Sequence, residues 1–168
     1  MYDFDKLTAR SGTLSYKWDV CDGELPMWVA DMDFETLPEV KEAILSKASI
    51  GAYGYTYVPY EYFTAYRKWW EEVHNVSFKE EWMIFSNGIV AAISSIIRKI
   101  TNVGDSIVIQ APVYNCFYSS IKNNNRNILT NDLLYKDGEY HIDYKDLEEK
   151  LSKEETKLFI HCNPHNPV

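Results

Sequence analysis

The second half of the sequence alternates short apolar runs with helical segments, and this order constrains the fold more than any other feature. We expect strands at residues 82–85, 106–110, 128–134 and 158–161. We expect helices between them at residues 89–100, 112–123 and 143–151. Consecutive parallel strands require crossover connections of this kind. The sequence therefore predicts an α/β fold with a mostly parallel sheet and flanking helices.

The first half of the sequence has a different pattern. Residues 1–35 mix charged, aromatic, Gly and Pro residues without periodicity, which indicates an arm that packs outside the main core. Pro38 suits the first turn of a helix that ends before Gly51, because proline lacks an N–H that would have no partner there. Pro59 opens a second helix with an aromatic face, which ends at His74-Asn75.

Charge and hydropathy exclude several classes of protein. The chain has 17 Lys and Arg against 25 Asp and Glu, so its net charge is −8, and we expect no binding to nucleic acid. We expect no membrane span and no signal peptide, because no run approaches about 20 apolar residues and the start has no apolar core. Cys21, Cys116 and Cys162 are far apart, so we expect reduced thiols and a cytoplasmic location.

Three loops follow expected strands at what should be one edge of the sheet. Ser86-Asn87-Gly88-Ile89-Val90 leads into a helix whose first N–H groups can bind an anion. Tyr114 follows the next strand, and two Asn-Pro steps at 163–167 follow the last one. Each loop also has an ordinary explanation: a strand-to-helix turn, a core tyrosine and a proline-rich turn. Together they predict an anion cradle, a stacking ring and a hydrogen-bond donor at the carboxyl edge of the sheet.

Three other patterns carry less weight. Side chains alternate along a strand, so His161 and Cys162 should point to opposite faces, and we expect no metal site from His161, Cys162 and His165. Cys116 has no evident His or acidic partner, so we expect no nucleophilic thiol. Aromatic residues make up 15% of the chain, and their number favours a filled core over ligand stacking.

Several motifs resemble one enzyme family from end to end. Val29-Ala30-Asp31-Met32-Asp33-Phe34 and Cys162-Asn163-Pro164-His165-Asn166-Pro167-Val168 are the most specific of them. On these motifs the chain resembles the amino-terminal part of pyridoxal-phosphate enzymes of the class I/II aminotransferase fold, in the branch of cystathionine β-lyases of the MalY/PatB type. Further matching stretches are Lys17-Trp18-Asp19, Leu25-Pro26-Met27-Trp28, Gly54-Tyr55-Thr56, Gly88-Ile89-Val90, Pro112-Val113-Tyr114 and Lys122-Asn123-Asn124.

The resemblance implies a role for each of five residues toward pyridoxal 5'-phosphate. The backbone of Gly88, Ile89 and Val90 would hold the phosphate at the start of a helix. Tyr114 would stack on the pyridine ring, and Asn166 would donate a hydrogen bond to the phenolic oxygen. These roles suit the residue types, since a flat ring stacks on a flat ring and an amide can donate to a phenolate.

The resemblance also implies an organisation and a partner. Residues 1–50 would form an N-terminal arm and small-domain segment, and residues 51–168 an incomplete large domain of the pyridoxal-phosphate fold type I. Tyr55 would reach the phosphate of the neighbouring subunit in a homodimer, and Ala30 would lie near the carboxylate of a small sulfur amino acid. The substrate would be cystathionine or a cysteine S-conjugate, cleaved to a thiol, pyruvate and ammonia.

The chain as written is expected to be inactive alone. In the family the Schiff-base lysine comes later than the motifs found here, and no lysine of this chain lies in the matching motif, so we assign no catalytic residue. The loop after the strand at 158–161 lacks a covering helix, which favours a truncated domain with an open sheet edge and poor solubility. Two alternatives stay open: an aminotransferase on the same fold, and a non-catalytic remnant or half of a split protein.

Overall fold

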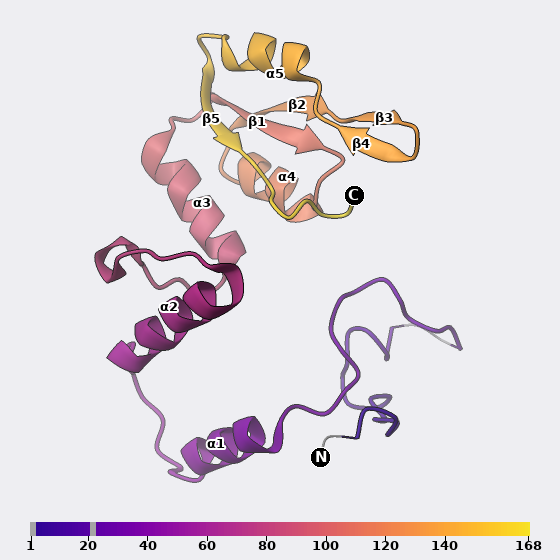
Figure 1. The fold of residues 1–168 in the computed structure, drawn as a ribbon, viewed down its shortest axis with the longest axis vertical. Helices are drawn as coiled ribbons and strands as arrows, with labels where there is room; N and C mark the ends of the chain where they lie inside the picture. Colours follow the sequence, from indigo (N-terminus) through magenta and orange to yellow (C-terminus); the bar gives the residue numbers. More distant parts are fainter. Residues whose placement is uncertain (1–2, 21–22) are drawn as a thin grey trace. The chain divides into compact units, whose positions relative to one another are not determined.

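The structure, a computed structural model, describes residues 3–20 and 23–168 and divides into two compact units (Figure 1). Unit 1 is Met1–Tyr57 and unit 2 is Val58–Val168. Cys21, one of the cysteines used in the sequence argument, lies outside the described residues. The two units are taken one at a time below.

Unit 1 contains α1 (Pro38–Ala48), preceded by turns and irregular backbone in the residues described. Pro38 occupies the first turn of α1, as expected, and Gly51 follows the helix with a positive φ of 71°. The Asp19 carboxylate accepts hydrogen bonds from the backbone N–H groups of Gly12 (2.7 Å) and Ser15 (2.8 Å). Polar contacts of this kind, rather than periodic apolar contacts, organise the first part of the chain.

Unit 2 begins with helices and continues with the alternating strands and helices. Its elements are α2 (Tyr60–His74), η1 (Glu80–Trp82), α3 (Ile89–Ile100), β1 (Ser106–Ala111), α4 (Asn115–Lys122), β2 (Asn127–Asp132), β3 (Leu134–Lys136), β4 (Glu139–His141), α5 (Tyr144–Leu151) and β5 (Thr156–Ile160). The main sheet has the order β2-β1-β5, and both pairings are parallel. The parallel α/β sheet expected from the sequence is confirmed.

The sheet is covered on both faces. On one face, Ile107 and Ile109 of β1 pack with Ile97 of α3 and Ile121 of α4, and all four are fully buried. The opposite face carries the alternate residues, and α5 packs there against β2 and β5. Figure 1 shows α5 on one side of the sheet and α3 and α4 on the other. Strand alternation therefore divides each strand into a face toward α3 and α4 and a face toward α5.

Four expected boundaries differ from the structure. The strand expected at 82–85 is wrong: η1 ends at Trp82, and Met83 is extended (φ −95°, ψ 130°) without pairing to a described strand. A strand requires a hydrogen-bonded neighbour, which an apolar run cannot specify by itself. The helix expected from Pro112 starts at Asn115, β5 starts at Thr156, and the run at 128–134 is divided between β2 and β3. The Asp137-Gly138 turn joins β3 to β4 in an antiparallel hairpin that was not expected.

Candidate functional site

The start of α3 has the properties of an anion-binding helix end. Gly88 is the N-cap residue with φ 99° and ψ 157°, and no side chain caps the helix. The Ser86 hydroxyl donates to the Gly88 carbonyl (3.2 Å), not to the N–H groups of the first turn. Ile89 and Val90 are 74% and 47% exposed, so the first turn is open to solvent. Uncapped N–H groups and the positive end of the helix dipole favour a bound anion here.

The loop between β1 and α4 is tied to the last loop of the chain in two places. The backbone N–H of Tyr114 donates to the Asn166 carbonyl at 2.9 Å. The His165 Nε2 lies 2.8 Å from the Pro112 carbonyl oxygen. The peptide bonds before Pro112, Pro164 and Pro167 are cis. The structure therefore brings Tyr114 and Asn166 together at the carboxyl ends of β1 and β5.

Tyr114 presents an accessible ring at this edge. It is the N-cap residue of α4, with backbone angles outside the helical region, and its side chain is 49% exposed. A side-chain hydrogen bond with the Cys116 thiol raises the pKa of the Tyr114 phenol above its usual value. The phenol thus stays neutral near physiological pH, as suits a ring that stacks on a planar ligand.

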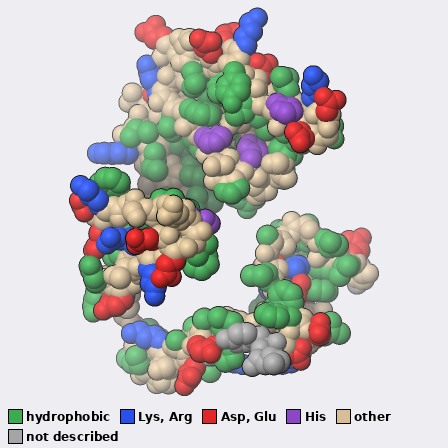
Figure 2. Space-filling model, in the orientation of Figure 1, with side chains coloured by type: hydrophobic (Ala, Val, Ile, Leu, Met, Phe, Trp, Pro, Cys, Tyr) green, Lys and Arg blue, Asp and Glu red, His purple; other side chains and the backbone are tan. Residues whose placement is uncertain are grey.

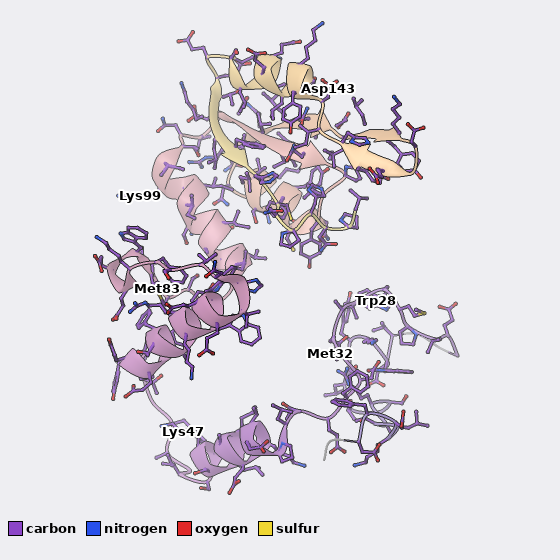
Figure 3. The ribbon with its side chains drawn as sticks, viewed as in Figure 1. Trp28, Met32, Lys47, Met83, Lys99 and Asp143 are labelled. Carbon is purple, nitrogen blue, oxygen red and sulfur yellow. The ribbon has the colours of Figure 1, made fainter. Side chains whose placement is uncertain are left out.

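A large cleft adjoins the start of α3. It has a volume of about 730 Å³, and of the described residues Tyr114 and Asn166 do not line it. Its walls are aromatic and aliphatic side chains of α2 and of the segment before α3, where Figure 3 labels Met83. α3 and α4 pack against each other, but a single cavity shared by Gly88, Tyr114 and Asn166 stays a prediction.

A second cavity of about 400 Å³ lies beside the last loop of the chain. Its lining residues include Gln110, His161, Cys162, Asn163 and His165. Figure 2 shows histidine side chains gathered on one face of unit 2. Cys162 packs against the apolar core, whereas His161 contacts Gln110 on the opposite face of the sheet. Within the described residues no group of three or more His, Cys, Asp or Glu side chains is arranged to hold a metal ion.

Ala30 and Tyr55 lie in unit 1 and are exposed. Sequence reasoning missed what positions the segment around Ala30, where Figure 3 labels Trp28 and Met32. The Asp33 carboxylate accepts from Lys17 Nζ and Trp18 Nε1, each at 2.7 Å. Lys17 Nζ also donates to the Asp31 carbonyl at 2.8 Å.

Arg10 belongs to the same group of contacting side chains, which we call the arm cluster: Arg10, Lys17, Trp18, Asp31 and Asp33. Arg10 Nη1 lies 2.7 Å from Asp31 Oδ2 and 3.3 Å from Asp33 Oδ1. Hydrogen bonds from Lys17 and Trp18 lower the pKa of Asp33, and the Asp31 carboxylate raises the pKa of Arg10. The two aspartates of the Val29–Phe34 motif therefore tie the segment that follows Ala30 to Arg10 and Lys17.

The parallel sheet with these loops at its carboxyl edge defines the chain as an α/β protein, and in open α/β sheets that edge is where ligands generally bind. Residues 25–168 match the aminotransferase class I and II family. Cystathionine beta-lyase PatB of Bacillus subtilis is 44% identical over 98% of this chain and 44% of its own length. A PLP-bound putative aminotransferase from Clostridium difficile 630 has a TM-score of 0.91 at 40% identity, covering 100% of this chain and 45% of that one.

The PLP-bound C-S lyase from Staphylococcus hominis has a TM-score of 0.90 at 34% identity, covering 99% of this chain and 43% of that one. The chain belongs to the aminotransferase class I and II family. It spans less than half the length of these relatives. The resemblance identified from the motifs and the fold class expected with it are confirmed. In the part of the chain that the structure describes, no helix is both long and apolar enough to cross a membrane.

Proposed function

We propose that this chain supplies the phosphate- and ring-binding part of a pyridoxal-phosphate-dependent lyase that cleaves carbon–sulfur bonds in small amino acids. The observation that carries the proposal is the exposed, uncapped start of α3 behind Gly88. Its donor set fits a phosphate, since backbone N–H groups and the helix dipole both favour a dianion. Similarity to the cystathionine beta-lyase PatB supports the choice of a lyase.

Each residue of the site has one task in this proposal. The N–H groups of Ile89 and Val90 bind the phosphate, and Gly88 provides the positive φ that begins the helix there. Tyr114 stacks on the ring, and Asn166 donates to its phenolic oxygen. When bound, pyridoxal phosphate withdraws electrons from the α-carbon of an amino acid, which lets a β-substituent leave.

The remaining parts of the proposal concern unit 1 and a homodimer. Tyr55 binds the phosphate held by the partner subunit of a homodimer, and Ala30 lies near the carboxylate of the sulfur amino acid. The arm and small-domain segment is residues 1–50 and the large-domain part is residues 51–168. The protein acts in the cytoplasm on cystathionine or a cysteine S-conjugate. The arm cluster supports the place of Ala30, because it fixes the backbone next to that residue.

Cofactor titration tests the phosphate site. Gly88→Ala should weaken binding of pyridoxal phosphate to the 168-residue chain about tenfold or more, since a charge-assisted hydrogen bond is worth about 1.5–3 kcal/mol and 1.4 kcal/mol is tenfold. Gly104→Ala is the matched control: Gly104 has φ 90° against 99° for Gly88, and an added Cβ meets no atom within 4 Å at either position. Equal affinities of the two variants, measured by ring absorbance, would contradict the proposed phosphate site.

An activity assay separates the lyase from its alternatives. We infer that the 168 residues with pyridoxal phosphate release no pyruvate from cystathionine, because none of their lysines lies in the motif that the family uses to hold the cofactor. In a longer protein containing this chain, pyruvate release without an added keto acid supports the lyase. Amino-group transfer to a keto acid would instead identify an aminotransferase. Pyruvate from the 168 residues alone would overturn the assignment of no catalytic residue to this chain.

A further inference from the structure

A row of polar side chains crosses the sheet on the face toward α5. Gln110 of β1 and Asn131 of β2 are register partners. Ile109 pairs with Ile160 of β5, so the next step along both strands places His161 opposite Gln110. Gln110 and Asn131 are only 2% and 0% exposed, although both side chains are polar. Buried amide side chains normally have hydrogen-bond partners, so the partners of Gln110 and Asn131 show what this row can do.

The row is joined by hydrogen bonds from α5 to the last loop. Asn131 Nδ2 donates to Asp146 Oδ2 at 2.7 Å and to the Asp143 carbonyl at 3.0 Å. Gln110 Nε2 donates to Asn131 Oδ1 at 3.4 Å. His161 Nδ1 lies 2.7 Å from Gln110 Oε1. Figure 3 labels Asp143 at the start of α5, above the sheet.

These contacts have a fixed direction, set at the α5 end. A carboxylate and a backbone carbonyl only accept, so Asn131 must turn its NH₂ group toward Asp146 and Asp143 and its oxygen toward Gln110. Gln110 must then donate to Asn131 and turn its own oxygen toward His161. That oxygen only accepts, so His161 Nδ1 must carry a hydrogen. The hydrogen bond from Asn131, and then that from Lys150 Nζ at 2.7 Å, lower the pKa of Asp146 and keep its carboxylate an acceptor.

We propose that this relay holds neutral His161 as its Nδ1–H tautomer and presents the Nε2 lone pair to an N–H or O–H group of the ligand. His161 lines the cavity that Asn163 and His165 also line, next to Asn166. Among the described residues, none forms a hydrogen bond with its Nε2. The proposal rests on the proposed function for the identity of the ligand, but the tautomer itself is a property of the chain alone. Gln110, Asn131 and Asp146 are positioning residues that act through His161.

His165 provides an internal control with the opposite constraint. Its Nε2 lies 2.8 Å from the Pro112 carbonyl, which only accepts, so neutral His165 must be the Nε2–H tautomer. The two histidines are separated by three residues in one loop and are expected to carry their hydrogen on different nitrogens. An imidazole without a fixed partner exchanges between both forms.

Two-bond ¹H–¹⁵N NMR on the ¹⁵N-histidine-labelled 168-residue chain tests the relay, without cofactor and at a pH where imidazole is neutral. His161→Gln and His165→Gln assign the signals. We expect the Nδ1–H form of His161 in about tenfold excess, which corresponds to about 1.4 kcal/mol, and the Nε2–H form at His165. An Nε2–H form at His161, or the same mixture at both residues, would overturn the proposal.

Variants at Gln110 separate the relay from simple packing. Gln110→Leu fills the same space without an acceptor, so the excess of the Nδ1–H form should fall to within about twofold of equality. Gln110→Glu keeps an acceptor toward His161 and should keep the Nδ1–H form, so it serves as the conservative rescue. His165 should be unchanged in both variants. An unchanged tautomer in Gln110→Leu would contradict the relay, whereas failure of the cofactor titration at Gly88 would contradict only the proposed function.

Discussion

Apolar side chains lie in opposite environments in the two units. Leu7 and Leu14 of unit 1 are 95% and 96% exposed, whereas Ile107 and Ile109 of unit 2 are fully buried. The buried side chains of unit 1 include Ser15 and Lys17, at 7% and 8% exposure. Unit 2 is thus organised by an apolar core between its sheet and helices, and unit 1 by charged and polar contacts.

This difference shows which parts of the chain are held in place by contacts among their own residues. The β1 region pairs with strands on both sides and packs on two helices, so its core contacts lie within residues 93–162. The arm cluster has few apolar contacts and instead joins the buried Lys17 and the partly exposed Arg10 to the partly exposed Asp31 and Asp33. Figure 2 shows hydrophobic side chains on the surface of both units.

The largest expected effect comes from shortening a side chain in the core of unit 2. Ile109→Ala should lower the free energy of unfolding by about 2–5 kcal/mol, because it leaves a cavity among fully buried side chains. Leu7→Ala in unit 1 should change it by less than about 0.5 kcal/mol. Urea denaturation of both variants measures the two values. Similar losses in the two variants would show that unit 1 has a core of its own and would break the comparison.

A smaller test concerns the cap of α5. The Asp143 side chain accepts from the Asp146 N–H at 3.0 Å, so Asp143→Ala should cost about 1 kcal/mol of unfolding free energy. Lys145→Ala, an exposed position of the same helix, is the control and should cost less than about 0.5 kcal/mol. If Asp143→Ala matches the control in the same urea titration, α5 is held by the sheet and not by its cap.

Local signals in the sequence predicted helix starts in both units. Pro38, Gly88 and Asp143 mark the starts of helices, and each lies within the first turn or at the cap of the helix expected there. The strand expected at 82–85 failed because pairing depends on a neighbour that the run does not encode. The relay from Asp146 to His161 could not be predicted because the register of three strands decides which polar side chains meet.

The site shows the same division between local and long-range signals. Loop position after a strand correctly predicted that Tyr114 and Asn166 come together. The aromatic cleft beside Gly88 was not expected, because it is formed with α2, which is distant in sequence. The arm cluster joins residues up to 23 positions apart, and no turn or periodic pattern specifies such contacts. Short motifs therefore identified the loops that we propose bind the ligand, and the structure identified the contacts between them.

The smallest expected effect is the pH response of the arm cluster, which sharpens the comparison because unit 2's apolar core should not share it. Hydrogen bonds from Lys17 and Trp18 lower the pKa of folded Asp33. The stabilising contribution of Asp33 is therefore fully present above its unfolded pKa of about 3.9 and is lost as the pH falls through the lower folded value. The Trp18 Nε1–H donates to Asp33, so its NMR signal should shift in that acidic range.

Two variants decide whether Asp33 is the titrating group. Asp33→Asn keeps an oxygen that can accept from Trp18 but cannot ionise in this range, so the Trp18 transition should disappear. Glu35→Gln removes the exposed ion pair of Glu35 with Lys6 and should leave the transition in place. A Trp18 transition that persists in Asp33→Asn would show that another carboxylate responds to pH. In that case the charges of Arg10 and Lys17 would stabilise the arm through Asp31, and the motif's second aspartate would be only a packing contact.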